Sequence, residues 1–189
     1  MESITYKKTT GMALAGLFAA IAAVCSWISI PLGFTPVPVN LATLAVMLAG
    51  GLLGKKYGTI SLTVFTLVGA VGVPVFAGFR GGLSVLAGPT GGYIVGYIAM
   101  AFVIGLLMEQ CSRPGEDAKG KVVVVIKTVV SMIAGLAACY LLGTAWFIVS
   151  TGTGLAAAMV SCVIPFLPGE VLKITAATIL VRKLRRFIR

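Results

Sequence analysis

The sequence contains no histidine and only five acidic residues. Without histidine, the chain cannot form a Ser-His-Asp triad, an imidazole general base or a His-containing metal site. Charged residues make up 11% of the 189 residues, whereas 59% are apolar and the mean hydropathy is +1.08. Ordinary soluble domains are only about 45–50% apolar, even with glycine included. The composition therefore excludes a soluble protein and indicates an integral membrane protein. It also leaves too few ionisable side chains to fill the catalytic roles of an enzyme.

Metal and nucleotide motifs are missing as well. The four cysteines show no CxxC spacing, and we expect them to be inert apolar filler without a metal site or a disulfide framework. They are Cys25, Cys111, Cys139 and Cys162. A phosphate-binding loop requires the pattern GxxxxGK[ST], which the chain does not contain. We therefore expect no cofactor and no ATP site in this chain.

Six apolar stretches predict an all-α integral membrane protein, a single six-helix domain over residues 1–189. They cover approximately residues 11–30, 39–53, 59–73, 91–108, 122–145 or slightly beyond, and 155–181. A membrane-spanning helix needs about 20 residues, so the second and third stretches are short for a full crossing. The first stretch is too long for the apolar core of a cleaved signal peptide, and we expect it to be retained.

The basic residues predict the orientation of these spans. Twelve lysines and arginines fall on one side of the predicted membrane: Lys7, Lys8, Lys55, Lys56, Arg113, Lys119, Lys121, Arg182, Lys183, Arg185, Arg186 and Arg189. Arg80 alone falls in a loop on the other side. The positive-inside rule then places both termini in the cytoplasm. The positive charges therefore indicate a lipid bilayer as partner and no nucleic acid.

Prolines and glycines concentrate in the predicted outer half. Seven of the eight prolines map there, and residues 72–93 form a glycine-rich connection. Non-helical backbone at membrane depth is tolerated only where protein buries it or where it lines a cavity. Glycine also lets the backbone approach a ligand closely. We therefore expect the ligand pocket in the outer half.

Two charges interrupt the last apolar stretch. In the segment PFLPGEVLK, Glu170 and Lys173 follow a break made by Pro165, Pro168 and Gly169. Their spacing of three residues places them on one face of the resumed helix. Each charge would cost about 2.5 to 3.5 kcal/mol at mid-bilayer, so such a pair is by default a functional site. The alternative is a salt bridge that only stabilises the helix.

Ala15, Ala19 and Ala23 form a row at four-residue spacing in the first stretch. Small residues at this spacing allow two helices to approach closely in lipid. The row alone does not tell whether the neighbouring helix belongs to the same chain or to another subunit.

Three segments together resemble the biotin-specific substrate-binding subunits of energy-coupling factor transporters, the BioY family. The segments are TPVPVNLATLAVMLAGGLLG, GVPVFAGFRGGLSVLAGPTGGY and PFLPGEVLK, at residues 35–54, 72–93 and 165–173. The resemblance implies six helices in a prokaryotic cytoplasmic membrane, with both termini inside and a biotin pocket open to the outside. It also implies a transmembrane coupling subunit that packs on the alanine row, and a pair of partner ATPase subunits that alone use ATP.

Combining the resemblance with the chemistry of biotin gives a set of candidate contacts. We expect Lys173 to pair with the biotin carboxylate and Glu170 to accept a ureido N–H, with Arg80 as an alternative carboxylate partner. Thr90, Gly91, Gly92 and Tyr93 are expected to supply donors and a ring. Asn40 and Phe79 are expected to line the cavity.

Two departures from the family pattern bear on the ligand. Glu170 stands where the family usually has Asp, and Ala42 stands where it often has Gln. Biotin and a close precursor therefore both stay open as ligands. A self-sufficient proton-driven transporter is the competing class, but such proteins commonly show a broken helix in each half, and this chain shows only one charged break.

Overall fold

The computed structural model describes residues 8–33, 35–110 and 118–185, and these are mostly helical. The helices are α1 (Lys8–Trp27), α2 (Ala42–Ala70), α3 (Leu83–Ala87), α4 (Gly91–Glu109), α5 (Ala118–Thr151), α6 (Leu155–Cys162), the 3-10 helix η1 (Ile164–Phe166) and α7 (Leu167–Leu184). Two short antiparallel strands, β1 (Ser29–Ile30) and β2 (Val39–Asn40), join α1 to α2. The predicted all-α class is confirmed in this coarse form.

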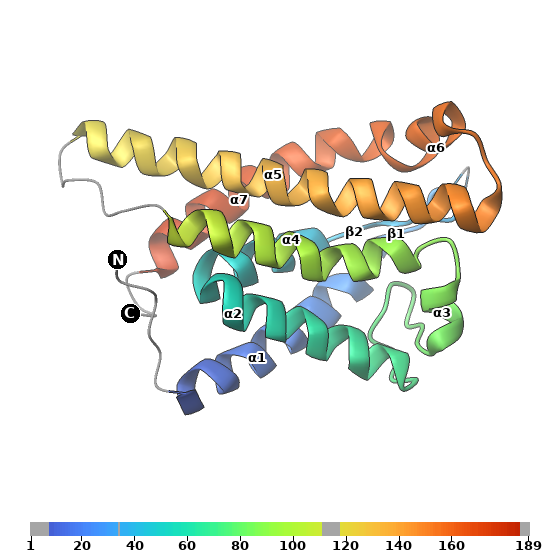
Figure 1. Cartoon of the computed structure of the whole chain (residues 1–189), viewed down its shortest axis with the longest axis horizontal. Coiled ribbons are helices and arrows are strands. Elements are labelled where there is room, and N and C mark those ends of the chain that lie inside the picture. Colours follow the sequence, from blue (N-terminus) through green and yellow to red (C-terminus); the bar gives the residue numbers. More distant parts are fainter. Residues whose placement is uncertain (1–7, 34, 111–117, 186–189) are drawn as a thin grey trace.

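The long helices run side by side along the length of the molecule (Figure 1). Helix α4 packs between α2 and α5, while α1 covers α2 and α7 contacts both α2 and α5. The start of α1, the start of α5 and the ends of α4 and α7 lie at one end, and α3 and α6 lie at the other (Figure 1). This places the connections at residues 71–90 and 152–154 together, opposite the end where the chain enters α1.

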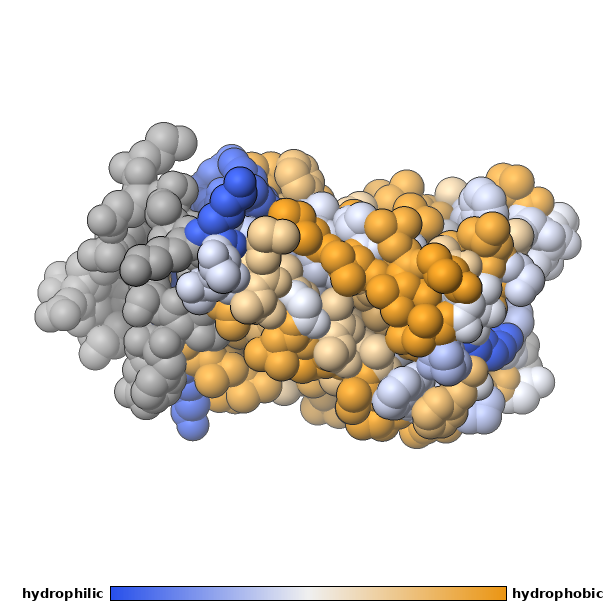
Figure 2. Space-filling model, turned by 90° about the horizontal axis from the view of Figure 1, so that it is seen from below, coloured by the Kyte–Doolittle hydropathy of each residue, from blue (hydrophilic) through white to orange (hydrophobic). Residues whose placement is uncertain are grey.

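Four helical stretches of the described residues are long and apolar enough to cross a membrane. They are Lys8–Trp27, Gly91–Glu109, Val122–Thr151 and Leu155–Leu184, the last containing the η1 break. Apolar side chains also form a band across the middle of the surface in Figure 2, with hydrophilic residues toward the two ends. A helix bundle that is apolar inside and outside suits a lipid environment. The predicted count of six spans and the predicted side of the termini stay predictions.

Helix α2 accounts for the second and third predicted stretches, because it is broken at Gly54. This residue has φ 75° and ψ −176°, which divides α2 into two arms at residues 42–53 and 55–70. The exposed start of the second arm is capped by α4: the Lys55 backbone N–H donates to Glu109 Oε1 at 3.0 Å, and Lys55 Nζ lies 3.3 Å from Glu109 Oε2. Gly105 of α4 fits against the backbone of Lys55 so closely that a Cβ would overlap it.

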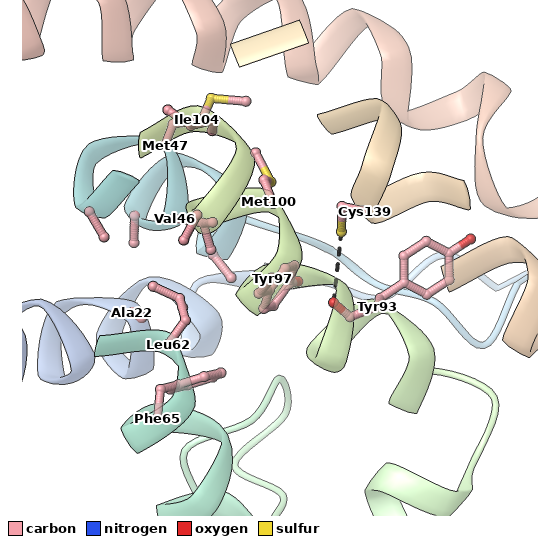
Figure 3. Close-up of a cluster of buried hydrophobic side chains, with 14 of the residues drawn as sticks. Ala22, Val46, Met47, Leu62, Phe65, Tyr93, Tyr97, Met100, Ile104 and Cys139 are labelled. Atoms are coloured by element: carbon pink, nitrogen blue, oxygen red, sulfur yellow. Dashed lines mark hydrogen bonds between the residues drawn. The ribbon is translucent and has the colours of Figure 1, made fainter. Parts of the chain in front are cut away.

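The core lies where α2, α4 and α1 meet. Val46, Met47, Leu62 and Phe65 of α2 pack with residues of α4 and α1 (Figure 3). Met100 and Ile104 of α4 and Ala22 of α1 complete the part shown there. These side chains are almost fully excluded from solvent. The close packing of α2 on α4 fixes one wall of the cavity described below.

The alanine row of α1 faces the interior. Ala15, Ala19 and Ala23 are 2%, 8% and 7% exposed, and α1 packs on α2. The row is therefore an intrachain contact, which corrects the expectation that it lies on an outer face for a coupling subunit. The physical reason is that small side chains let α1 approach α2 closely. The outward face of α1 includes the small residues Ala13, Gly16 and Ala20.

We predict that Gly105→Ala destabilises the protein by about 1–3 kcal/mol, the usual cost of overpacking, because the new methyl group overlaps the α2 backbone. Gly16→Ala is the matched control, since a Cβ there meets nothing within 4 Å. The control is expected to leave stability unchanged or slightly raised, because alanine favours a helix over glycine. Thermal unfolding of the two purified variants in detergent measures the difference, and equal melting temperatures would contradict this packing.

Candidate functional site

A pocket opens between α2, α4, α5 and α7, beneath the connections at residues 28–41 and 71–90. It leaves about 730 Å³ of space unoccupied by atoms, its open mouth included. Most of its wall is apolar or aromatic, with rings from Phe65, Phe76, Tyr93, Tyr97, Tyr140 and Phe166. Asn40, Thr43, Arg80, Thr90, Glu170 and Lys173 add polar groups. An apolar cavity with a few polar groups is the usual form of a small-molecule site.

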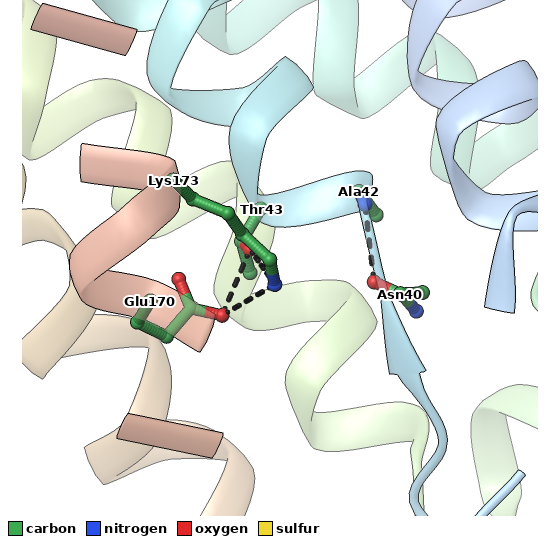
Figure 4. Close-up of polar contacts among 5 residues, drawn as sticks. All are labelled: Asn40, Ala42, Thr43, Glu170 and Lys173. Carbon is green, nitrogen blue, oxygen red and sulfur yellow. Dashed lines mark hydrogen bonds and ion pairs between the residues drawn. The ribbon is translucent and has the colours of Figure 1, made fainter. Parts of the chain in front are cut away.

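The polar centre of the pocket is a closed set of contacts among Glu170, Lys173 and Thr43 (Figure 4). Lys173 Nζ donates to Glu170 Oε1 at 2.8 Å and to Thr43 Oγ1 at 3.0 Å. The Thr43 hydroxyl in turn donates to Glu170 Oε1 at 3.0 Å. Both charged residues are buried, at 3% and 8% exposure. Their opposite charges compensate each other, which is the condition for burying a charge in a low-dielectric wall.

The local sequence explains how these three side chains meet. Pro165 lies in η1 and Pro168 in the first turn of α7, so the helix restarts there and places Glu170 in its first turn. The positive end of a helix dipole favours a carboxylate at that position. Thr43 comes from the first turn of α2, where Asn40 Oδ1 accepts the Ala42 N–H at 3.1 Å. Two helix starts therefore meet at the ion pair.

One oxygen of this centre has no partner among the residues that the structure describes. Glu170 Oε2 is buried and makes no hydrogen bond to any described residue. An unsatisfied buried polar atom costs about 1–3 kcal/mol, so most such atoms in native proteins are paired. Because Glu170 lines the pocket, a ligand with an N–H donor can supply the missing partner.

Arg80 lies at the mouth of the pocket. Its backbone pairs with Phe76 across a tight turn, with Phe76 N–H donating to Arg80 O at 2.9 Å. The Arg80 side chain is exposed and donates through Nε to Ala77 O at 3.2 Å. Gly81 follows, and a Cβ there would overlap the backbone of Val73, so this turn requires glycine. The remaining guanidinium N–H groups make no hydrogen bond to a described residue.

Tyrosines of α4 and α5 form the opposite wall. The Tyr93 hydroxyl lies 3.0 Å from Thr144 Oγ1, and its ring meets Tyr140 edge-to-face with centroids 6.2 Å apart. Cys139 donates through Sγ to the Tyr93 carbonyl at 3.7 Å (Figure 3). Gly143 of α5 lies so close to the Tyr93 ring that a Cβ would overlap it. These contacts hold the Tyr93 ring in one orientation.

Most sequence-predicted site residues meet at this pocket. Glu170, Lys173, Arg80, Tyr93, Thr90 and Asn40 all line it. Gly91, Gly92 and Phe79 do not. Gly91 packs against the Leu86 carbonyl and Gly92 against Trp146, so these glycines allow close helix packing. Phe79 lies outside, exposed, where its ring stacks on Trp27.

Sequence reasoning missed several lining residues. Thr43 lies inside a segment that resembles the family, but nothing in its spacing marks it as a partner of Glu170. Tyr140 and Tyr97 are aromatic residues within apolar stretches, and no feature of the sequence distinguishes them as pocket residues. Cys139 and Cys162 are buried in the wall, whereas Cys111 lies outside the described residues. No pattern within one helix identifies these residues, because only the packing of helices brings them to the cavity.

Comparisons with known proteins agree with this geometry. The model of the BioY family matches residues 1–189. A biotin transporter BioY of Rhizobium etli is 38% identical over 175 residues, covering 92% of each chain. A probable biotin transporter BioY of Pyrococcus horikoshii is 34% identical over 178 residues, covering 94% of this chain and 98% of that one. A biotin transporter BioY of Thermotoga maritima is 56% identical over 96 residues, but this match spans only 51% of this chain and 56% of that relative.

The fold has a solved counterpart. The crystal structure of the S-component for biotin from an ECF-type ABC transporter matches with a TM-score of 0.82 and 28% identity, over 97% of this chain and 95% of that one. The named relatives are transporters and not enzymes, and with the apolar helices they indicate a multi-pass membrane protein. Because the family model covers residues 1–189 and two relatives above 30% identity match over more than nine-tenths of their length, the chain belongs to the BioY family.

Proposed function

We propose that this chain binds biotin in the pocket and is the substrate-binding subunit of an energy-coupling factor transporter for biotin uptake. The observation that carries the proposal is the unpartnered, buried Oε2 of Glu170 in the wall of an aromatic cavity. A ureido ring offers an N–H donor for this oxygen, and the apolar thiophane ring suits the aromatic wall. Family membership and the likeness to a biotin S-component support biotin as the ligand.

In this proposal, Lys173 donates a hydrogen bond to the ureido ring of biotin. An ammonium group has three N–H donors, and Glu170 and Thr43 accept hydrogen bonds from two of them. The third can donate to the ureido carbonyl oxygen. The charge of Lys173 is already compensated by Glu170 at 2.8 Å, so a second carboxylate beside the pair would add an uncompensated negative charge. Of the two cations considered from the sequence, Lys173 is therefore the less suitable partner for the biotin carboxylate.

Arg80 is the carboxylate partner that the geometry favours. It lies at the mouth of the pocket, and within the described residues its side chain makes one hydrogen bond, to Ala77 O. A planar guanidinium can bind a carboxylate through two parallel hydrogen bonds. Biotin would then lie with its ring system at Glu170 and its valerate tail toward the outer end.

Uptake requires partner subunits, because binding of biotin does not by itself carry it across the membrane and we expect no ATP site in this chain. In the proposed topology, six spans cross a prokaryotic cytoplasmic membrane with both termini inside, and the two arms of α2 provide the second and third spans. A transmembrane coupling subunit would pack on α1 at Gly16 and Ala20, two of its outward small residues, with a pair of ATPases bound to it. Close helix approach in lipid requires such small residues.

We predict that Lys173→Met weakens biotin binding more than tenfold, or about 1.4 kcal/mol, because Glu170 is left as an uncompensated buried charge. Calorimetric titration of the detergent-purified chain measures the affinity. Lys127→Met is the matched control, because Lys127 is exposed on α5 and should leave the affinity unchanged. The double variant Glu170→Gln/Lys173→Met removes both charges, so it should fold and still fail to bind. A normal titration for Lys173→Met would remove this lysine from the site.

Arg80→Gln is expected to weaken binding of biotin about tenfold but to leave binding of biotin methyl ester within about twofold, since the ester carries no charge for Arg80 to pair with. Competition against labelled biotin gives both affinities. If Lys173→Met, and not Arg80→Gln, removes the preference for biotin over its ester, the carboxylate lies at Lys173 and the orientation proposed above is reversed.

Gly16→Leu is expected to abolish uptake in vesicles that contain the chain together with its coupling subunits, while biotin binding is retained, because Gly16 is exposed and a Cβ there meets nothing within 4 Å. Ala137→Leu, on the exposed face of α5, is the matched control and should transport normally. Uptake driven by a proton gradient in vesicles that contain the purified chain alone would instead establish a self-sufficient transporter.

A further inference from the structure

A second hollow lies directly outside the pocket. This outer groove is lined by Trp27, Ser29, Pro31, Thr35, Pro36, Pro38 and residues 77–80, and it leaves about 780 Å³ unoccupied by atoms, open space included. Three of its lining residues, Pro38, Ala77 and Arg80, also line the pocket. The groove and the pocket are therefore neighbours, and Arg80 lines both of them.

The wall of the outer groove is held in place by specific contacts. The Trp27 indole N–H donates to Pro74 O at 2.7 Å, and the Trp27 ring stacks on Phe79 with centroids 5.1 Å apart and an interplanar angle of 22°. Phe79 has φ 56°, a left-handed conformation that is uncommon for any residue other than glycine. Such strain persists only where surrounding contacts impose it. The aromatic wall is thus built into the fold before any ligand arrives.

We propose that the outer groove receives the substituent of a biotin amide, a biotin whose carboxyl carbon is linked to an amine such as the side chain of lysine. This inference rests on the proposed function, in which the carboxyl end of biotin reaches Arg80. Because Arg80 lines both hollows, a substituent on that carbon would extend from Arg80 into the groove. Arg80 then donates to the amide carbonyl, while the methylene chain lies against proline and aromatic surfaces, which suit an aliphatic stem with a polar end in water.

The chemistry of the Arg80 guanidinium allows it to bind both ligand forms. A guanidinium accepts no hydrogen bond but donates to either a carboxylate or an amide oxygen. A neutral acceptor forms a weaker hydrogen bond than an ionised one, so the amide should bind less tightly than biotin, by up to about tenfold. A closed pocket would instead exclude the amide altogether.

The test is competition of unlabelled biotin and biotinyl-lysine against labelled biotin on the detergent-purified chain. We expect biotinyl-lysine to compete within about tenfold of biotin. Ser29→Trp fills the outer groove and should weaken biotinyl-lysine more than tenfold, while biotin stays within about twofold. Ser84→Trp, exposed on α3 and outside both hollows, is the matched control and should change neither affinity. Pro36→Trp, an exposed residue of the same groove, provides a second variant if Ser29→Trp does not fold.

The outcomes separate this inference from the proposed function. If biotin binds and biotinyl-lysine does not compete, the groove is not a substituent site and the proposed function stands. If the groove variants weaken both ligands equally, the groove acts only through the structure of the pocket, and the inference is overturned. If neither ligand binds the unaltered chain, both proposals fall.

Discussion

The site depends on one interaction, the buried ion pair between Glu170 and Lys173. Two charges can stay in a wall that is otherwise apolar only because they lie 2.8 Å apart and share the hydroxyl of Thr43. Removing one partner of such a pair typically costs 3–5 kcal/mol, so each residue constrains the other. The pair also leaves one carboxylate oxygen of Glu170 without a hydrogen bond to any described residue, and a ligand N–H donor can satisfy this oxygen.

Close helix packing holds this pair in place. The break at Gly54 folds α2 back on itself, and Gly105 lets α4 lie against the turn. Thr43 is then held at the start of one arm of α2, and Tyr93 is held by Gly143 and Thr144 of α5. In lipid there is no hydrophobic driving force between helices, so close packing and hydrogen bonds must provide this order. The alanine row of α1 belongs to the same system, since it brings α1 onto α2.

Several parts of the site could be predicted from the sequence because they depend on local patterns. A charged pair after two prolines is recognisable in a run of apolar residues, and its spacing places both side chains on one helix face. The direction in which the alanine row faces could not be predicted, because α1 carries small residues on more than one face. Gly91 and Gly92 lie in a glycine-rich connection, but their missing side chains make room for Leu86 and Trp146 and do not line the pocket.

The sequence by itself determined the membrane class, the family resemblance and the position of the acid and the amine, because composition and short spacings carry these. Only the tertiary structure decided that Thr43 completes the polar centre, that Lys173 is already paired, and that Arg80 lines two neighbouring hollows. The physical reason is that these contacts join residues that are far apart in the sequence. Thr43 and Glu170 are 127 residues apart, and no local pattern encodes which of many apolar helix faces will meet.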